Sequence, residues 1–400
     1  MADIFSQYGG QYIAGNRTNE QQRSIIHLLS ACGTSALGSH FEQCDHCQYT
    51  GKANNSCRNR HCPRCQQKDK LEWAAKRMEE LLPVGYSHLV FTIPHQFNPL
   101  CLQNKKTMYR ILFKAASETV LELARDPKHL GADTGLITVL HTWGQNMMEH
   151  PHLHCIMPAG GLSFDRQHWV HLPDPNEFFI AGKVLAKKFR GKFLDMLKVA
   201  HRKGELQFHQ QLLAIKGSVQ FNRFLSPLYK LNWVVNVQKP MGSSPERILE
   251  YLSRYVFRIA ITDRRILAVE NGKVRFSWKD YRTGRFNRMK LDIDEFIRRF
   301  LLHLLPKGFC KVRHYGIFSP QKRKENIETA KRLLSEETQC HDQEALEDGL
   351  RVMQKQDTIW DEIGQAIRAY RQPNCPACKK GRLRFAGIVY DDAHLHFEPG

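Results

Sequence analysis

Two histidines in an alternating pattern could hold a catalytic metal ion. They stand in segment 150–154, which reads His-Pro-His-Leu-His. Alternate side chains of a β-strand share a face, so we expect His152 and His154 to point the same way. Two imidazoles on one face can bind a divalent ion and leave positions open for a substrate phosphate. We expect Gln145 to add an oxygen ligand, with His141 as the alternative.

Two tyrosines four residues apart could supply a nucleophile for the same reaction. On a helix, Tyr251 and Tyr255 would be neighbours on one face, with Arg254 and Arg258 beside them. Each pair alone has an ordinary explanation, because such histidines and tyrosines usually pack in the core or lie on the surface. A tyrosine hydroxyl, with a pKa of about 10, is a poor nucleophile unless a metal ion polarises the phosphate that it attacks. The histidine motif would therefore supply the metal ion that a tyrosine needs, and the tyrosine motif would supply the nucleophile.

Cysteine pairs in the amino-terminal region indicate a structural metal site. Two Cys-x-x-Cys motifs stand fourteen residues apart, Cys44 with Cys47 and Cys62 with Cys65. Two thiolate pairs can close a tetrahedral zinc site, and four protein ligands leave no open position for catalysis. We therefore predict one structural zinc ion held by these four thiols rather than a set of buried free cysteines. Cys57 and His61 are spare donors, so the quartet could be drawn differently.

A third Cys-x-x-Cys motif lies near the end of the sequence. Cys375 and Cys378 form half of a zinc ribbon, and their partners stay open. The other donors in this part of the chain are Cys340, His341, His394 and His396.

The charge balance points to a polyanionic partner. The 400-residue chain has 59 Lys and Arg against 40 Asp and Glu, a net charge of +19. Such an excess favours nucleic acid, with affinity that falls steeply as salt rises. We expect DNA contacts from arginines among the zinc ligands, from a basic helix and from the tyrosine motif: Arg58, Arg60, Arg64, Lys187, Lys188, Arg190, Arg254 and Arg258. Trp143, Trp169 and Phe189 are candidates for base stacking.

Membrane and secreted proteins are the competing classes. No apolar run approaches the roughly 20 residues that span a bilayer, and segment 1–5 lacks the basic and apolar character of a signal peptide. The cysteines are clustered rather than spread, which is typical of metal ligands rather than disulfides. We expect a cytoplasmic protein that binds nucleic acid.

Strand and helix patterns occur in mixed order, so the expected class is α+β. Strands are expected at 88–93, 135–143, 152–158 and 231–238, and helices at 20–31, 68–82, 105–124 and 245–258. Asn271-Gly272 predicts a tight hairpin, and Asp292 with Glu295 predicts a capped helix start. The expected domains are an amino-terminal zinc domain, a nuclease core with a basic helical insertion, and a mainly helical carboxy-terminal region: 1–82, 83–265 with the insertion at about 172–230, and 266–400.

These motifs together resemble the two-tyrosine rolling-circle transposases of bacterial insertion sequences, which belong to the wider His-hydrophobe-His endonucleases. The resemblance covers most of the chain. It is carried by segments 56–65, 91–94, 141–154, 251–255, 294–300 and 311–316. It implies an antiparallel sheet of about five strands flanked by helices, with the histidines on a central strand and the tyrosine helix across it.

The same resemblance implies a chemistry and a substrate. It implies Mg²⁺ or Mn²⁺, a 5′-phosphotyrosyl intermediate with a free 3′-hydroxyl, and single-stranded transposon ends and target DNA as partners. Two tyrosines would permit two successive attacks. It also implies a bacterial protein associated with the nucleoid. Whether the protein forms a homo-oligomer is left open.

Two alternatives remain at this point. A replication initiator or relaxase would use the same chemistry in another process. A non-enzymatic, zinc-dependent DNA-binding protein would explain the charge and the cysteines but leave the histidine and tyrosine pairs as coincidence. A transposase with a carboxylate triad is less attractive, because no acidic trio stands at expected strand ends.

Overall fold

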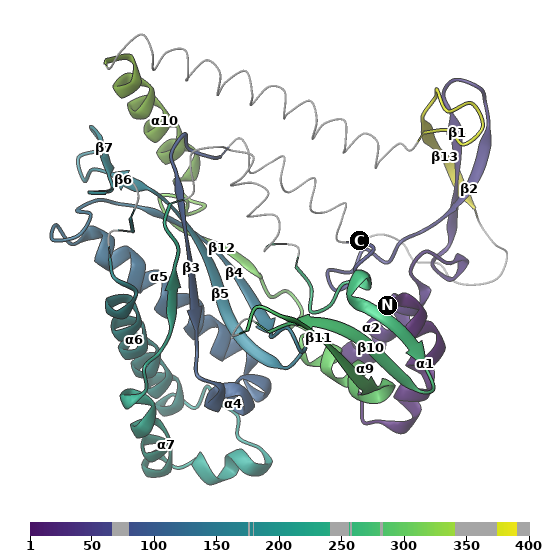
Figure 1. The fold of residues 1–400 in the computed structure, drawn as a ribbon, viewed down its shortest axis with the longest axis horizontal. Coiled ribbons are helices and arrows are strands. Elements are labelled where there is room, and N and C mark those ends of the chain that lie inside the picture. The colour runs from purple at the N-terminus through teal and green to yellow at the C-terminus, as the bar shows by residue number, and fades with distance from the viewer. Residues whose placement is uncertain are drawn as a thin grey trace. The chain divides into compact units, whose positions relative to one another are not determined.

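The computed structural model describes residues 1–65, 80–174, 177–178, 180–240, 256, 258–280, 283–340 and 374–389. The described residues fall into two compact units. The first contains 1–65, 259–304 and 374–389, and the second contains 80–258 and 305–340 with the gaps given above. Figure 1 labels most of the helices and strands of both units. The third domain expected at 266–400 is therefore not a separate unit, because its parts pack into both units.

A five-stranded antiparallel sheet forms the centre of the second unit. The strand order is β12-β4-β5-β3-β8. These strands are β3 (Tyr86–Thr92), β4 (Gly135–Trp143), β5 (Glu149–Pro158), β8 (Val235–Val237) and β12 (Val312–Gly316). All four neighbouring pairs are antiparallel. The expected α+β class and the central position of the histidine strand, β5, are confirmed.

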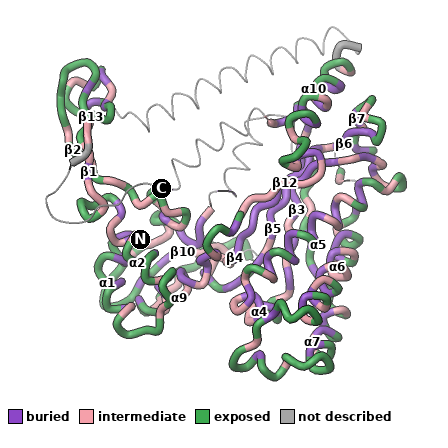
Figure 2. Tube along the Cα trace, turned by 180° about the vertical axis from the view of Figure 1, so that it is seen from behind, coloured by how far each residue is buried: buried purple, intermediate pink, exposed green. Residues whose placement is uncertain are grey.

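Helices cover one face of this sheet. The unit contains η2 (His95–Phe97), α4 (Asn98–Gln103), α5 (Lys105–Arg125), α6 (Gly182–Arg202), η3 (Gln210–Ile215), α7 (Ser218–Lys230) and α10 (Arg323–Cys340). A small two-stranded sheet joins β6 (Gly160–Leu162) and β7 (Trp169–His171). In β5, Leu153 and Cys155 belong to the hydrophobic core that includes α5 and α6, and the buried strands and helix faces are visible in Figure 2. Because side chains alternate along a strand, His152 and His154 lie on the other face.

The basic stretch forms α6, as expected, and its apolar face is a large part of the core. Phe189 and Phe193 are fully buried and make edge contacts with Trp233, with ring centroids 5.4 Å apart in both pairs. Burying a phenylalanine side chain contributes about 2–3 kcal/mol. Phe189 therefore stabilises the fold and is not available for base stacking. Trp169 is buried as well, with 3% of its surface exposed.

The first unit combines helices with two three-stranded sheets. Its elements are α1 (Ala2–Gly15), α2 (Glu20–Ala31), η1 (Ser35–Leu37), β1 (Ser39–Cys44), β2 (Thr50–Asn54), η4 (Asp263–Arg265), β9 (Ile266–Glu270), β10 (Lys273–Lys279), β11 (Phe286–Asp292), α9 (Ile293–Leu302) and β13 (Leu383–Val389). The sheet orders are β13-β1-β2 and β11-β10-β9. Phe5 of α1 and Phe300 of α9 meet edge to face with centroids 5.2 Å apart.

Local signals in this unit behave largely as predicted. Helix α2 has the expected bounds, and its first turn is closed by a reciprocal capping box between Asn19 and Gln22. Asn271 and Gly272 both have positive φ, 52° and 68°, the conformation of a type I′ hairpin turn. Asp292 is the N-cap of α9, but its side chain makes no capping hydrogen bond.

Several expected elements lie outside the described residues. These are the helices at 68–82 and 245–258 and the helical tail between Cys340 and Arg371. Among the described residues, no helix combines the length and the apolar character needed to cross a membrane.

Candidate metal centres

Three histidines come together on the open face of the five-stranded sheet. His141 of β4 pairs in register with His152 of β5, and His154 follows two residues later on the same face. One ring nitrogen from each of the three lies within 4.8 Å of the others. His141 and His154 are buried, with 1% and 7% of their surface exposed, and His152 is half-buried. We call these three residues the histidine cluster.

The cluster agrees only partly with the expected ligand set. His152 and His154 are brought together as predicted, and the third imidazole is His141, which was the alternative to Gln145. Gln145 lies in the turn after β4, so its role as a ligand stays a prediction.

Hydrogen bonds engage the Nδ1 atoms of both β5 histidines. His152 Nδ1 is 2.7 Å from the carbonyl oxygen of His150, so Nδ1 donates and Nε2 keeps its lone pair. His154 Nδ1 is 2.9 Å from His88 Nε2, and Gln238 raises the pKa of His88 by a side-chain hydrogen bond. One of these two ring nitrogens donates and the other accepts. In the tautomer in which His154 Nδ1 donates, His154 Nε2 keeps the lone pair that a metal ion needs.

Burial keeps these imidazoles neutral. It lowers the pKa of His152 to about 3, with smaller contributions from neighbouring charges, and holds the pKa of His154 well below its usual value. Burial also lowers the pKa of His88 to about 4. Neutral imidazoles are the form that binds metal ions, so the lowered pKa values of His152 and His154 favour their metal-binding form.

Two cationic side chains lie near the histidine cluster. The charge of Arg258 contributes to the lowered pKa of both His152 and His154, and the charge of Lys311 contributes for His154. Lys311 Nζ donates to the carbonyl oxygens of Val256, at 3.1 Å, and Arg258, at 2.8 Å. It also lies 5.4 Å from the centre of the Trp143 ring. Lys311 therefore ties the chain at 256–258 to the part of the sheet that carries the histidines.

The residues expected as nucleophiles, Tyr251 and Tyr255, lie outside the described residues, as does Arg254. The described chain resumes at Val256, immediately after Tyr255.

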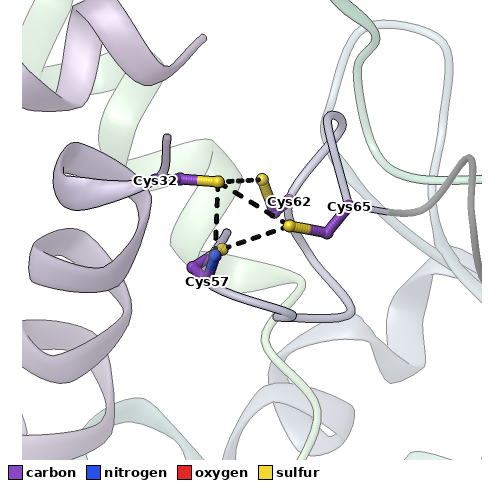
Figure 3. Close-up of side chains that lie close together, drawn as sticks. All are labelled: Cys32, Cys57, Cys62 and Cys65. Carbon is purple, nitrogen blue, oxygen red and sulfur yellow. Dashed lines mark hydrogen bonds between the residues drawn. The ribbon is translucent and has the colours of Figure 1, made fainter. Parts of the chain in front are cut away.

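Four cysteines of the first unit form a compact group, shown in Figure 3. Cys32 at the end of α2 meets Cys57, Cys62 and Cys65 from the following loop. The Sγ atom of Cys65 lies 3.7 Å from that of Cys32 and 3.6 Å from that of Cys57, and Cys62 Sγ lies 3.6 Å from Cys32 Sγ. A tetrahedral zinc ion with bonds of about 2.3 Å requires thiolates about 3.8 Å apart. We call this group the amino-terminal thiol cluster.

The predicted quartet of Cys44, Cys47, Cys62 and Cys65 is wrong. Cys44 and Cys47 lie at the tip of the β1–β2 hairpin and group instead with Cys375 and Cys378. We call this second group the split thiol cluster. The fourteen-residue spacing between the two Cys-x-x-Cys motifs is compatible with one zinc site. However, the β1–β2 hairpin separates Cys44 and Cys47 from Cys62 and Cys65, and strand β13 pairs with the other edge of β1. Sequence analysis missed Cys32. The three cysteines in 57–65 were the signal that a fourth thiol was needed.

The arginines among these ligands are exposed. Arg58, Arg60 and Arg64 all present their side chains to solvent, and Arg64 also donates to the carbonyl oxygen of Cys32, 3.1 Å away. Their position fits phosphate contact, which stays a prediction.

The basic residues singled out on α6 differ from one another. Lys187 is exposed. Lys188 pairs with Glu122 at 2.9 Å, and Arg190 donates to the carbonyl oxygen of Leu231 at 2.8 Å. Two of the three side chains therefore hold the fold together, and Lys187 is the best candidate for a DNA contact.

Comparisons with known proteins bear on both sets of ligands. A family model described as "Putative transposase" matches residues 135–326, which include the histidine cluster. A model described as "Transposase zinc-binding domain" matches residues 4–93, which include the whole amino-terminal thiol cluster. "Putative transposase y4qJ" of Sinorhizobium fredii is 41% identical over 385 residues, covering 96% of this chain and 94% of that protein. The chain belongs to this transposase family.

A second relative extends the comparison to a named element. The "Transposase for insertion sequence element IS801" of Pseudomonas savastanoi is 27% identical over 297 residues, which is 74% of this transposase and 69% of that relative. No solved structure matches the chain. The expected family is confirmed, and the match to the zinc-binding domain together with the thiol geometry supports a structural zinc ion in the amino-terminal thiol cluster.

Proposed function

We propose that this transposase nicks and rejoins single-stranded DNA at transposon ends through a 5′-phosphotyrosine intermediate. Tyr251 and Tyr255 are the nucleophiles, and the histidine cluster holds the catalytic Mg²⁺ or Mn²⁺. The observation that carries the proposal is the cluster itself: three imidazoles on one sheet face, beside Arg258 and Lys311.

The donor set fits a catalytic ion better than a structural one. Three protein donors leave positions open for substrate, whereas four thiolates close the coordination of zinc. His152 and His154 both have Nδ1 engaged, which directs Nε2 toward a metal ion and fixes each ring. Imidazole donors suit Mn²⁺ better than Mg²⁺, which prefers oxygen ligands and octahedral geometry. We therefore expect higher activity with Mn²⁺ at equal concentration.

In the proposed reaction the tyrosyl oxygen attacks phosphorus and the bond from phosphorus to the 3′ oxygen breaks. The phenol loses its proton to solvent and the 3′ oxygen gains one. The bound ion would polarise the scissile phosphate and stabilise the departing oxygen. The charge of Arg258 would neutralise part of the phosphate charge, and Lys311 would hold the backbone at 256–258 in place. The phosphotyrosine bond retains the energy needed for rejoining.

Exposed basic side chains in each unit are proposed as phosphate contacts. Exposed arginines of the zinc-binding domain and Lys187 of α6 would contact phosphates. Relatives of this chain are named transposases, which is why transposon ends and target DNA are proposed rather than a replication origin.

A nicking assay with single-stranded oligonucleotides that span the element ends tests this function. Wild-type protein should cleave in Mn²⁺ and not in chelator, and His152→Ala should bind the DNA but not cleave it. The exposed His168, changed to alanine, is the matched control and should cleave normally. Equal cleavage by His152→Ala, or cleavage in chelator, would refute the proposed metal centre. Comparing the Mn²⁺ affinities of His141→Ala and Gln145→Ala would identify the third ligand.

A further inference from the structure

The split thiol cluster joins two segments that are far apart in the chain. Cys44 and Cys47 flank the turn of the β1–β2 hairpin, and Cys375 and Cys378 lie in the turn before β13. The Sγ atoms of these four cysteines all lie within 4.8 Å of one another. The match to the zinc-binding domain ends at residue 93 and so includes only the first of these two pairs.

Sulfur distances in this cluster fit a metal ion and not disulfides. Cys44 Sγ lies 3.7 Å from Cys378 Sγ, and Cys47 Sγ lies 3.6 Å from Cys375 Sγ. A disulfide requires about 2.05 Å, whereas four thiolates around zinc lie about 3.8 Å apart because each zinc–sulfur bond is about 2.3 Å. The pairs that approach each other come from opposite segments, 334 and 328 residues apart. A metal bound here would therefore cross-link the two segments.

The two turns have the same backbone form. The residue after the second cysteine has a positive φ in both, 59° at Gln48 and 57° at Lys379. Backbone N–H groups point at sulfur in both as well: those of His46 and Cys47 at Cys44 Sγ, and that of Gly381 at Cys378 Sγ, 3.3–3.5 Å away. Amide donors stabilise a thiolate over a thiol. The backbone of each turn thus favours the thiolate form of one cysteine, Cys44 in the hairpin and Cys378 in the carboxy-terminal turn.

Packing around the cluster leaves no room at Gly381. A β-carbon at this position would lie 2.4 Å from Cys44 Sγ and 2.6 Å from the β-carbon of His46. The glycine therefore allows the carboxy-terminal turn to approach the hairpin closely enough for the sulfurs to meet.

Strand pairing holds the two segments in register. β13 pairs with β1 from Ser39 opposite Val389 to Cys44 opposite Leu383, with an irregularity after Phe41. Asp45 accepts from the backbone N–H of Arg382 at 2.8 Å and pairs with the guanidinium of Arg384 at 3.0 Å. The sheet β13-β1-β2 and the four cysteines at its end together form a zinc ribbon built from both parts of the chain.

We propose that Cys44, Cys47, Cys375 and Cys378 bind a second structural zinc ion, which fastens the carboxy-terminal strand to the amino-terminal hairpin. Four thiolates leave no coordination position for substrate, so this ion has no catalytic role. Its role is to close residues 374–389 onto the unit that carries the zinc-binding domain.

Zinc content of the purified full-length chain tests this directly. Wild-type protein should contain two zinc ions per chain. Cys375→Ser with Cys378→Ser should contain one, and Cys57→Ser with Cys62→Ser should also contain one. Cys310 is exposed and belongs to neither cluster, so Cys310→Ser should keep two. One zinc ion in the wild type, or two in the Cys375/Cys378 variant, would overturn the proposal.

A pair of glycine variants keeps the test informative if the cysteine variants fail to fold. Gly381→Ala should weaken binding of one of the two zinc ions about 10-fold or more, as supporting residues around a metal site commonly do. Gly387→Ala, in strand β13 that follows this turn, has nothing within 4 Å of the added carbon and should bind as wild type. Equal affinities in the two variants would contradict the proposal.

Alkylation of the wild-type protein gives a third readout. Cys375 and Cys378 should resist a maleimide reagent until a chelator is added and then react. Reaction of both thiols at the same rate with and without chelator would also overturn the second zinc site.

Discussion

The thiol clusters and the histidine cluster hold metal-binding groups in opposite ways. Each thiol cluster supplies four soft donors from loops and turns, with Cys32 at a helix end in the amino-terminal cluster, and the split cluster has only Leu383 beside its own cysteines in its apolar group. The histidine cluster supplies three donors from two paired strands whose other face is part of a large core. In the thiol clusters a bound metal ion would stabilise the local fold, whereas in the histidine cluster the folded sheet positions the metal ligands. Removing the metal should therefore unfold the region around a thiol cluster but only inactivate the histidine cluster.

The largest effect is expected from the amino-terminal thiol cluster. Cys57→Ser with Cys62→Ser should lose one zinc ion and unfold the amino-terminal region, because structural zinc contributes about 10–16 kcal/mol to the folding of small zinc domains. Zinc analysis and thermal unfolding followed by circular dichroism would measure this. Cys310→Ser provides the control. An unchanged unfolding temperature in the double variant would show that this cluster does not depend on metal.

His154→Ala should act on activity far more than on structure. Loss of a metal ligand should lower the nicking rate by about 10²–10³-fold, while zinc content stays that of the wild type. Nicking rates in Mn²⁺ and zinc analysis of the same preparation would check both parts. A variant that unfolds and loses zinc would break the distinction between the two kinds of site.

His88 should act through His154 rather than on the substrate. His88→Ala removes the partner of His154 Nδ1, and loss of such a partner typically lowers metal affinity 10–100-fold. Manganese titration would measure the affinity, and saturating Mn²⁺ should restore most of the nicking rate. His88→Gln, which keeps an acceptor, should lose less. A rate that saturating metal does not restore would contradict a positioning role.

Lys311 should have the smallest effect of this series. Lys311→Met leaves the carbonyl oxygens of Val256 and Arg258 without this donor, at a cost of about 1–3 kcal/mol. We expect a roughly 10-fold lower nicking rate with little change in Mn²⁺ affinity. The exposed Lys307, changed to methionine, is the control. Equal rates for the two variants would show that the link to 256–258 does not support catalysis.

Local signals predicted much of the fold. The bounds of α2, the Asn271-Gly272 turn and the alternation around Leu153 each depend on residues close in sequence, and all three are found as expected. The capping pattern expected at Asp292 and Glu295 is not formed, because the Asp292 side chain makes no capping hydrogen bond. Prediction from nearby residues was wrong for the zinc ligands. Cys44 and Cys62 are near in sequence, but the β1–β2 hairpin and the pairing of β13 with β1 place them in different clusters.

The candidate site shows the same limit. Strand alternation placed His152 and His154 together, but the choice between His141 and Gln145 depended on the register of β4 against β5, which no local pattern encodes. Trp169 and Phe189 were expected to be available to DNA and are buried, because tertiary packing decides which aromatic side chains face solvent.

A covalent-adduct experiment tests the central claim most directly. The protein would be incubated with Mn²⁺ and single-stranded oligonucleotides that span the element ends, then run on a denaturing gel beside Tyr251→Phe, Tyr255→Phe and the double variant. We predict a slow-migrating protein–DNA band that requires metal and at least one of the tyrosines, with DNA binding retained in the double variant. An unchanged band in the double variant, or no band with authentic ends despite tight binding, would contradict the account.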